Sequence, residues 1–163
     1  MIRKATEKDI PAAMELFTAA KSIMRSDGNM TQWEGNYPNE EIVRSDINKG
    51  GAHIVDHDRK PVGYFALLPS PEPTYSSING KWLDDTAPYF VIHRIASSPE
   101  SHGVFREIIE YALSVSGNLR IDTHRDNRIM RYVIERAGFS YCGVINLPDG
   151  SERLAYQMIT YAL

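Results

Sequence analysis

The chain has 163 residues, of which 42% are hydrophobic and 24% are charged. These proportions are typical of a soluble globular protein, and the length suits one domain with a sizeable core. The net charge of -3 argues against general nucleic-acid binding, which usually needs a basic face. No apolar segment is long enough to span a membrane, and the N-terminus lacks the apolar core of a signal peptide. The single cysteine, Cys142, excludes an internal disulfide and a cysteine-cluster metal site, so we expect a cytoplasmic protein.

The N-terminal third of the sequence predicts a short strand followed by two helices. The strand covers residues 1–5, and Thr6 then caps a helix that runs to about Arg25, with Pro11 in its first turn. The segment SDGNMTQWEGNYPNE is a loop rich in Gly, Asn and aromatic residues. The segment NEEIVRSDINKG is a second, shorter helix that ends at Gly-Gly.

The remaining residues predict six strands and two helices. Residues 52–70 form two strands around the charged turn DHDRK, residues 71–87 are irregular, and a third strand covers YFVIHRIAS. A helix over 102–116, the strand LRIDTH and the helix DNRIMRYVIERAG come next. The strands FSYCGVINL and RLAYQMITYA close the chain around the turn PDGSE. The order predicts one mixed α/β domain over residues 1–163, with a mostly antiparallel sheet flanked by helices.

Three stretches carry a family resemblance that extends over essentially the whole chain. They are VIHRIASSPESHGVFREIIEYA, DTHRDNRIMRYVIERAGF and CGVINLPDGSERLAYQM. In order and spacing they resemble the cofactor-binding strand, loop and helix, the later strand and helix, and the closing hairpin of the GNAT superfamily of N-acetyltransferases. The resemblance implies an acyl-coenzyme A acyltransferase fold and acetyl-coenzyme A as co-substrate.

Two positions depart from the family pattern. The family loop usually reads Gln/Arg-x-x-Gly-x-Gly/Ala, and here Glu100, Gly103 and Phe105 take these places, so only Gly103 fits. The family often has a tyrosine four residues before the Gly-Phe pair that acts as general acid on the cofactor sulfur. Here that position is Ile134, and Tyr132 points to roughly the opposite side of the helix.

The strand and helix around Gly103 are the predicted cofactor site. A helix start offers free N–H groups to a pyrophosphate, and Gly103 lets the backbone approach it, although Gly103 alone also suits an ordinary turn. We expect Phe105 to turn into the core and Glu100 to face water. The resemblance assigns cofactor contacts to these segments and to the later helix: Ile95, Ala96, Ser97, Ser101, His102, Gly103, Val104, Arg106, Asn127 and Met130.

His93 is the candidate for removing a proton from the acceptor amine. Strand alternation places Tyr89, Val91, His93 and Ile95 on one face and Arg94 on the other. An unperturbed histidine titrates near neutral pH, which suits a general base. A hydrogen-bonded core histidine is the alternative interpretation.

The loop after the first helix is the predicted acceptor wall. Trp33, Glu34 and Tyr37 would form an aromatic slot with one carboxylate, suited to an amine, and the alternative is a loop anchored by packed aromatics. At the mouth of the later helix, Asp126 is expected as N-cap, and His124 faces either solvent or the site.

The sequence predicts no metal site. His53 and His57 straddle a strand and a turn with Asp56, and no third partner is evident.

The resulting hypothesis is direct transfer of an acetyl group to the amine of a small molecule. The alternative within the fold is a module that binds acetyl-coenzyme A without transferring its acetyl group, which the missing tyrosine favours. The absence of a Gly-x-x-x-x-Gly-Lys-Ser/Thr segment excludes a P-loop hydrolase. We expect no membrane or nucleic-acid partner, and a homodimer is one assembly that the sequence allows.

Overall fold

Eight strands form one sheet in the order β1-β2-β3-β5-β6-β8-β7-β4, as described for residues 1–160 by a computed structural model. Every neighbouring pair is antiparallel except β5 and β6, which are parallel. The strand bounds are Ile2–Lys4 (β1), Ala52–His57 (β2), Lys60–Pro69 (β3), Asn79–Gly80 (β4), Phe90–Ser97 (β5), Asn118–Thr123 (β6), Ser140–Asn146 (β7) and Glu152–Ile159 (β8).

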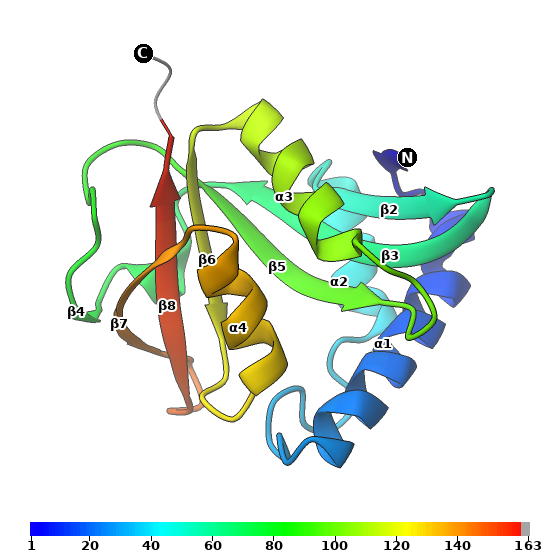
Figure 1. Cartoon of the computed structure of the whole chain (residues 1–163), viewed down its shortest axis with the longest axis horizontal. Coiled ribbons are helices and arrows are strands. Elements are labelled where there is room, and N and C mark those ends of the chain that lie inside the picture. The colour runs from blue at the N-terminus through cyan, green and yellow to red at the C-terminus, as the bar shows by residue number, and fades with distance from the viewer. Residues whose placement is uncertain (161–163) are drawn as a thin grey trace.

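Helices cover both faces of the sheet (Figure 1). Helices α1 (Ile10–Ser26) and α2 (Glu40–Asn48) lie on one face, and α3 (Val104–Val115) and α4 (Arg128–Arg136) lie on the other. Two short 3-10 helices, η1 (Glu7–Asp9) and η2 (Pro73–Tyr75), complete the described secondary structure. Within residues 1–160, none of the helices combines the length and the apolar character that crossing a bilayer requires.

The predicted order of elements and the mixed, mostly antiparallel sheet are confirmed, with two local differences. The segment 71–87, predicted to be irregular, contains η2 and the two-residue strand β4. The N-cap of α4 is Asn127, whose side chain accepts the Met130 amide at 3.0 Å, so the prediction of Asp126 was wrong by one residue. The predicted last strand reaches residue 162, and residues 161 and 162 lie outside the described residues.

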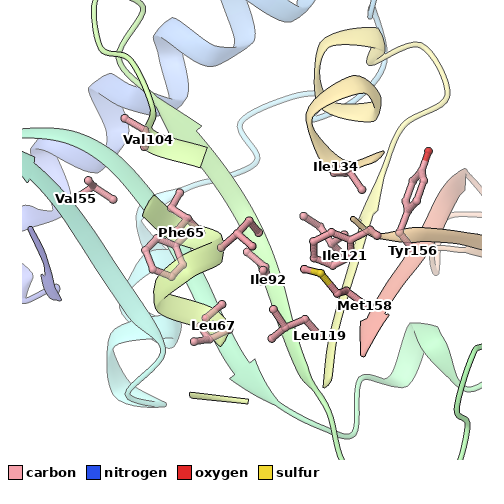
Figure 2. Close-up of a cluster of buried hydrophobic side chains, with 14 of the residues drawn as sticks. Val55, Phe65, Leu67, Ile92, Val104, Leu119, Ile121, Ile134, Tyr156 and Met158 are labelled. Carbon is pink, nitrogen blue, oxygen red and sulfur yellow. The ribbon is translucent and has the colours of Figure 1, made fainter. Parts of the chain in front are cut away.

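The main core lies between the sheet and the helix pair α3 and α4. Figure 2 shows Ile134 of α4 pointing toward Ile121 of β6 and Tyr156 of β8. Phe105 at the start of α3 is partly buried and packs against this cluster, as predicted. Ile129, by contrast, is exposed although its spacing places it on the apolar stripe of α4.

Strand β5 contains a bulge at Arg94 and Ile95 that changes which residues share a face. His93 pairs with Ala66 and Ala96 pairs with Tyr64, so two residues of β5 oppose one residue of β3. Arg94 adopts a φ of 56°, which is uncommon for a residue with a side chain. As a result Arg94 turns toward α2 while Ile95 packs on the α3 side, and the predicted alternation beyond His93 is wrong.

The same region of β5 separates from β6. The two strands pair only from Phe90 to Ile92 on β5, although β5 continues to Ser97 beside β3. Beyond Ile92 the edge of β5 that faces β6 therefore has no strand partner among the described residues. A wedge-shaped opening between two strands follows, and the candidate site lies at this opening.

A buried ion pair holds the bulged strand to the helix α2. Arg94 donates to both carboxylate oxygens of Asp46, from Nε at 2.9 Å and from Nη2 at 2.5 Å. The buried Tyr64 hydroxyl donates to the same carboxylate at 2.7 Å, and Asp46 is 1% exposed. Because each charged group has its partners, the pair is tolerated at a depth where an isolated charge would be costly.

Removing one partner of this pair should destabilise the protein strongly. We expect Asp46→Asn to lower the free energy of unfolding by about 3–5 kcal/mol, because it leaves the Arg94 charge buried without a counter-ion. The exposed Arg106–Glu110 pair provides the matched control, and Glu110→Gln should cost less than about 1 kcal/mol. Urea denaturation followed by circular dichroism measures both values. Equal effects of the two substitutions would contradict the role assigned to Asp46.

Candidate active site

A cleft of about 670 Å³ lies at the opening between β5 and β6. Its walls come from the ends of both strands, the start of α4, the loop after α1, the segment before η2 and the turn between β7 and β8. Seven of the predicted site residues line it: Trp33, Glu34, Tyr37, His93, Ile95, Asn127 and Met130. The cleft therefore brings the predicted acceptor wall, the predicted base and part of the predicted cofactor segment into one space.

One side of the cleft carries polar side chains on the sheet face that α1 and α2 also cover. Val91 and Ala155 belong to one buried cluster on that face, so His93 and Arg153, two residues away on the same strands, share it. Asp122 of β6 stands opposite Ala155. Glu72, His93, Asp122 and Arg153 all line the cleft, and we name them the polar wall.

His93 and Glu72 form a pair within the polar wall. His93 Nε2 lies 3.6 Å from Glu72 Oε1, which is longer than a hydrogen bond and within ion-pair range. The Thr74 hydroxyl donates to the same Glu72 oxygen at 2.9 Å. His93, and to a smaller extent Thr74, hold the pKa of the Glu72 carboxyl below its ordinary value although burial opposes this. Glu72 is therefore ionised at neutral pH and places a negative charge beside the His93 ring.

Asp122 has its own partner in the fully buried Tyr75. The Tyr75 hydroxyl donates to Asp122 Oδ2 at 2.6 Å. Burial, reinforced by the negative charge of Asp122, raises the pKa of Tyr75 well above its ordinary value. Tyr75 therefore stays neutral and acts as a fixed donor that holds the Asp122 carboxylate in place.

The loop after α1 is anchored by its aromatic residue and reaches the cleft with its polar ones. Trp33 is 9% exposed and packs edge-on against Phe17 with ring centroids 5.7 Å apart. Tyr37 accepts a hydrogen bond from Arg94 Nη1 at 3.1 Å, while Glu34 is exposed at the cleft. Trp33 is thus a packed core residue, as the alternative interpretation has it, and it also borders the cleft.

Asn127 and His124 connect this loop to the start of α4. Asn127 Nδ2 donates to Gln32 Oε1 at 3.0 Å, and Gln32 also accepts from Asn29. His124 Nδ1 accepts the Asp126 amide at 3.0 Å, so the ring proton lies on Nε2 and is donated to Thr31 Oγ1 at 2.9 Å. Burial, with a contribution from Arg153, lowers the pKa of His124 and keeps it neutral. His124 therefore has a bracing role, and it is not among the cleft-lining residues.

The start of α3 lies outside the cleft and supplies the predicted phosphate-binding segment. Gly103 is the N-cap with a φ of 76°, and no side chain caps the helix, so the first amides of α3 have no intrahelical partner. Ser101 donates its amide and its hydroxyl to the Ser98 carbonyl, so it supplies neither to a ligand in this arrangement. Val104 is buried in the core. His102 is exposed, and Arg106 points to solvent beside Glu110.

The surroundings of Glu100 agree with the expectation that this residue faces water. Glu100 is exposed and accepts from the Ser98 hydroxyl at 2.8 Å. The Ser98 hydroxyl thus satisfies the Glu100 carboxylate, which has no part in the predicted phosphate site.

Solved structures with the same fold identify the family. An acetyltransferase of the GNAT family from Streptococcus agalactiae shares 32% sequence identity with this chain at a TM-score of 0.88, covering 99% of this chain and 96% of its own. The chain belongs to the GNAT family of acetyltransferases. A GNAT acetyltransferase from Listeria monocytogenes (18% identity, TM-score 0.72, 98% and 94% coverage) has the same fold. So does the ribosomal-protein-alanine N-acetyltransferase from Brucella melitensis (18% identity, TM-score 0.62, 98% and 99% coverage). No protein-family model and no curated protein sequence matches the chain.

This GNAT protein has no tyrosine at the position where the family often places its acid. Ile134 is 0% exposed and belongs to the core beneath α4, so it does not reach the cleft. Tyr132 is exposed and accepts from Arg136 on the outer side of α4, as its position predicts. Cys142 is buried away from the cleft, and burial raises the pKa of its thiol, which makes it a poor nucleophile.

The polar wall contains three residues that the sequence did not single out. Glu72 lies in a Pro/Ser/Gly-rich segment, Asp122 lies within a strand, and Arg153 lies at the start of the last strand. Each is a charged residue on or beside an otherwise apolar strand. That pattern alone does not predict which cavity the side chain faces. His53 and His57, considered for metal, have other partners: His53 bonds the Gly51 carbonyl and His57 bonds Glu107.

The anchoring role of Trp33 leads to a stability prediction. We expect Trp33→Ala to lower the free energy of unfolding by about 3–5 kcal/mol, since it removes a buried aromatic that packs on Phe17. Met30→Ala in the same loop is the control and should change stability by no more than about 0.5 kcal/mol, because Met30 is exposed. Urea titration of both variants decides the matter. If Trp33→Ala were as mild as Met30→Ala, the loop would not be anchored by Trp33.

Proposed function

We propose that the protein transfers an acetyl group from acetyl-coenzyme A directly to the amine of a small molecule. The observation that carries this proposal is the His93–Glu72 pair in a cleft at the opening between β5 and β6. A proton acceptor beside an open strand edge is the arrangement that amine acetylation needs, because the amine must be neutral when it attacks. The GNAT family membership supports the reaction type.

The residues around the opening fit coenzyme A as a ligand. Ile95, Ala96 and Ser97 lie where β5 has lost its β6 partner, so their backbone can pair with an extended amide-containing arm. Gly103 and the first amides of α3 offer N–H groups and a partial positive charge to a pyrophosphate. Arg106 adds positive charge on the first turn of α3, since it is exposed and can leave its solvent-screened pair with Glu110, and the exposed His102 beside Gly103 offers a ring N–H. Acetyl-coenzyme A, when bound, supplies the activated acetyl thioester, and free coenzyme A leaves as the thiol.

The acceptor amine would enter from the polar wall and the loop after α1. Glu34, Glu72 and Asp122 give this side of the cleft carboxylates that attract a cationic amine. Trp33 and Tyr37 supply apolar surface for its carbon skeleton. His93 takes the amine proton directly or through a water, and the ionised Glu72 stabilises the imidazolium that results.

The departing thiolate needs a proton from water or another side chain, because Ile134 has none to give. A thiol has an unperturbed pKa of about 8.5, by analogy with cysteine, so the thiolate leaves readily. The general acid is worth roughly 10²–10⁴-fold in typical enzymes, so its absence slows the reaction without abolishing it.

A module that holds acetyl-coenzyme A without transferring its acetyl group is the second candidate. Its support is the fully buried Ile134 in place of the usual tyrosine. Release of free thiol in the presence of a library of amines separates the two candidates, because a binding module releases none above the rate of spontaneous hydrolysis.

The cofactor assignment predicts a binding defect at Gly103. We expect Gly103→Val to weaken coenzyme A binding by about tenfold or more, because a branched side chain strains the positive φ and crowds the approach to the first amides. Gly28→Val is the matched control, since Gly28 also has a positive φ and open space around its Cα. Titration calorimetry gives both dissociation constants. Equal affinities in the two variants would remove Gly103 from the cofactor site.

The proposed base predicts a pH-dependent defect. We expect His93→Gln to reduce kcat by about 10²-fold or more near neutral pH, with a loss that shrinks as pH rises because more amine is already neutral. His57→Gln is the control, since His57 pairs with Glu107 outside the cleft. Profiles of kcat against pH for the wild type and both variants test this. Profiles of the same height and shape for wild type and His93→Gln would exclude His93 from the reaction.

A further inference from the structure

Arg153 of β8 is a buried cation that forms no ion pair with any carboxylate among residues 1–160. It is 8% exposed and lines the cleft as part of the polar wall. Its Nη1 donates to the Glu152 carbonyl at 2.8 Å, and no carboxylate within residues 1–160 forms an ion pair with it. A guanidinium removed from water is costly unless it is paired, so this arrangement is suited to an anionic group from a ligand.

The charged groups around Arg153 have other partners or remain in solvent. Asp149 accepts from the Ser151 amide and hydroxyl at 2.9 and 2.6 Å in the exposed turn between β7 and β8. These bonds, and to a smaller extent the charge of Arg153, lower the pKa of the Asp149 carboxyl, but the two side chains form no ion pair. Asp122, one strand away, accepts from Tyr75, and His124 is neutral in its bonds to Thr31 and Asp126. Glu34 is exposed on the loop.

The other two cations of the cleft are in different situations. Arg94 is occupied by Asp46, and Lys49 is exposed. Arg153 is therefore the buried cation of this cleft that a ligand can pair with.

The position of Arg153 separates it from the proposed phosphate site. Arg153 faces the same side of the sheet as His93, whereas Val104 at the start of α3 packs on the opposite side. A guanidinium offers a planar pair of donors that matches a carboxylate in two parallel hydrogen bonds. The amine end of a ligand is favoured at Glu72, His93 and Asp122, which leaves Arg153 for an acid group of the same molecule.

We propose that the acceptor is an amino acid or a closely related amino-carboxylic acid, whose carboxylate binds Arg153 while its amine lies at His93. This inference rests on the proposed function and names its substrate class. The opposite charges at the two ends of the polar wall select a zwitterion over a simple amine or a diacid.

The test compares acceptors that differ only in the acid group. Thiol release is measured with acetyl-coenzyme A and the twenty common amino acids, each beside its carboxamide and its decarboxylated amine. For the accepted side chains we expect kcat/KM of the free acid to exceed that of the carboxamide by about 10- to 100-fold. Equal or better turnover of the carboxamides and decarboxylated amines would overturn the inference and leave the proposed transferase function intact.

Variants locate the effect at Arg153. Arg153→Gln should abolish the preference for the acid and leave the dissociation constant of coenzyme A unchanged, while Arg153→Lys should restore part of the preference. Arg136→Gln on the exposed side of α4 is the control and should keep the preference. Thermal melting of each variant identifies any loss of folding, in which case Arg153→Lys carries the test. An unchanged preference in folded Arg153→Gln or Arg153→Lys would overturn the inference.

Binding provides a readout that does not depend on turnover. Calorimetric titration of the coenzyme A complex with the same acids and carboxamides should show acid-specific binding that Arg153→Gln loses. Acid-specific binding without thiol release would overturn the proposed transferase function while supporting Arg153 as the carboxylate site. Absence of both acid-specific binding and acid-specific turnover would overturn the inference.

Discussion

The buried pair of Arg94 and Asp46 is the interaction on which the geometry of the site depends. Regular alternation would turn Arg94 to the α3 side, whereas the bulge turns it toward α2, where Asp46 and Tyr64 meet it. The same bulge lies where β5 separates from β6. The free edge of β5 therefore lies beside the Arg94 guanidinium, which Asp46 holds in place. Because Arg94 also bonds Tyr37, one charged group joins β5, α2 and the loop that closes the cleft. The positive φ of Arg94 is a local strain that this network offsets.

The candidate site, which comprises the cleft and the start of α3 outside it, divides its chemistry between the two faces of the sheet. The start of α3 and the free edge of β5 offer backbone groups, which suit the amides and phosphates of coenzyme A. The polar wall offers side chains of both charges, which suit a small acceptor. The two sets meet only at the opening between β5 and β6, where transfer would occur. The usual tyrosine would protonate the departing thiolate, and Ile134 stands in its place. Its absence slows acetyl transfer and leaves the binding of coenzyme A unaffected.

The order of the helices and strands could be predicted from the sequence, because the spacing of apolar residues and the turn residues between them indicate each element. Helices α3 and α4 and the Pro-Asp-Gly turn between β7 and β8 follow from local sequence alone. The bulge at Arg94 could not be predicted, since a one-residue slip depends on Asp46, 48 positions away. The same holds for Glu72 and Arg153: each is an ordinary charged residue until the fold shows which space it faces. The position of Trp33 at the cleft was predicted. Its packing against Phe17 could not be predicted from residue spacing, because it depends on how the loop folds onto α1.

Backbone hydrogen exchange shows whether the opening between β5 and β6 receives coenzyme A. Exchange is measured by mass spectrometry or NMR on the full chain with and without saturating coenzyme A. We expect new protection in residues 93–98 and in the first turn of α3 from Gly103 to Arg106, because a ligand that pairs with these amides slows their exchange. If saturating coenzyme A protected only other segments and left residues 93–98 and 103–106 unchanged, coenzyme A would not bind at this opening.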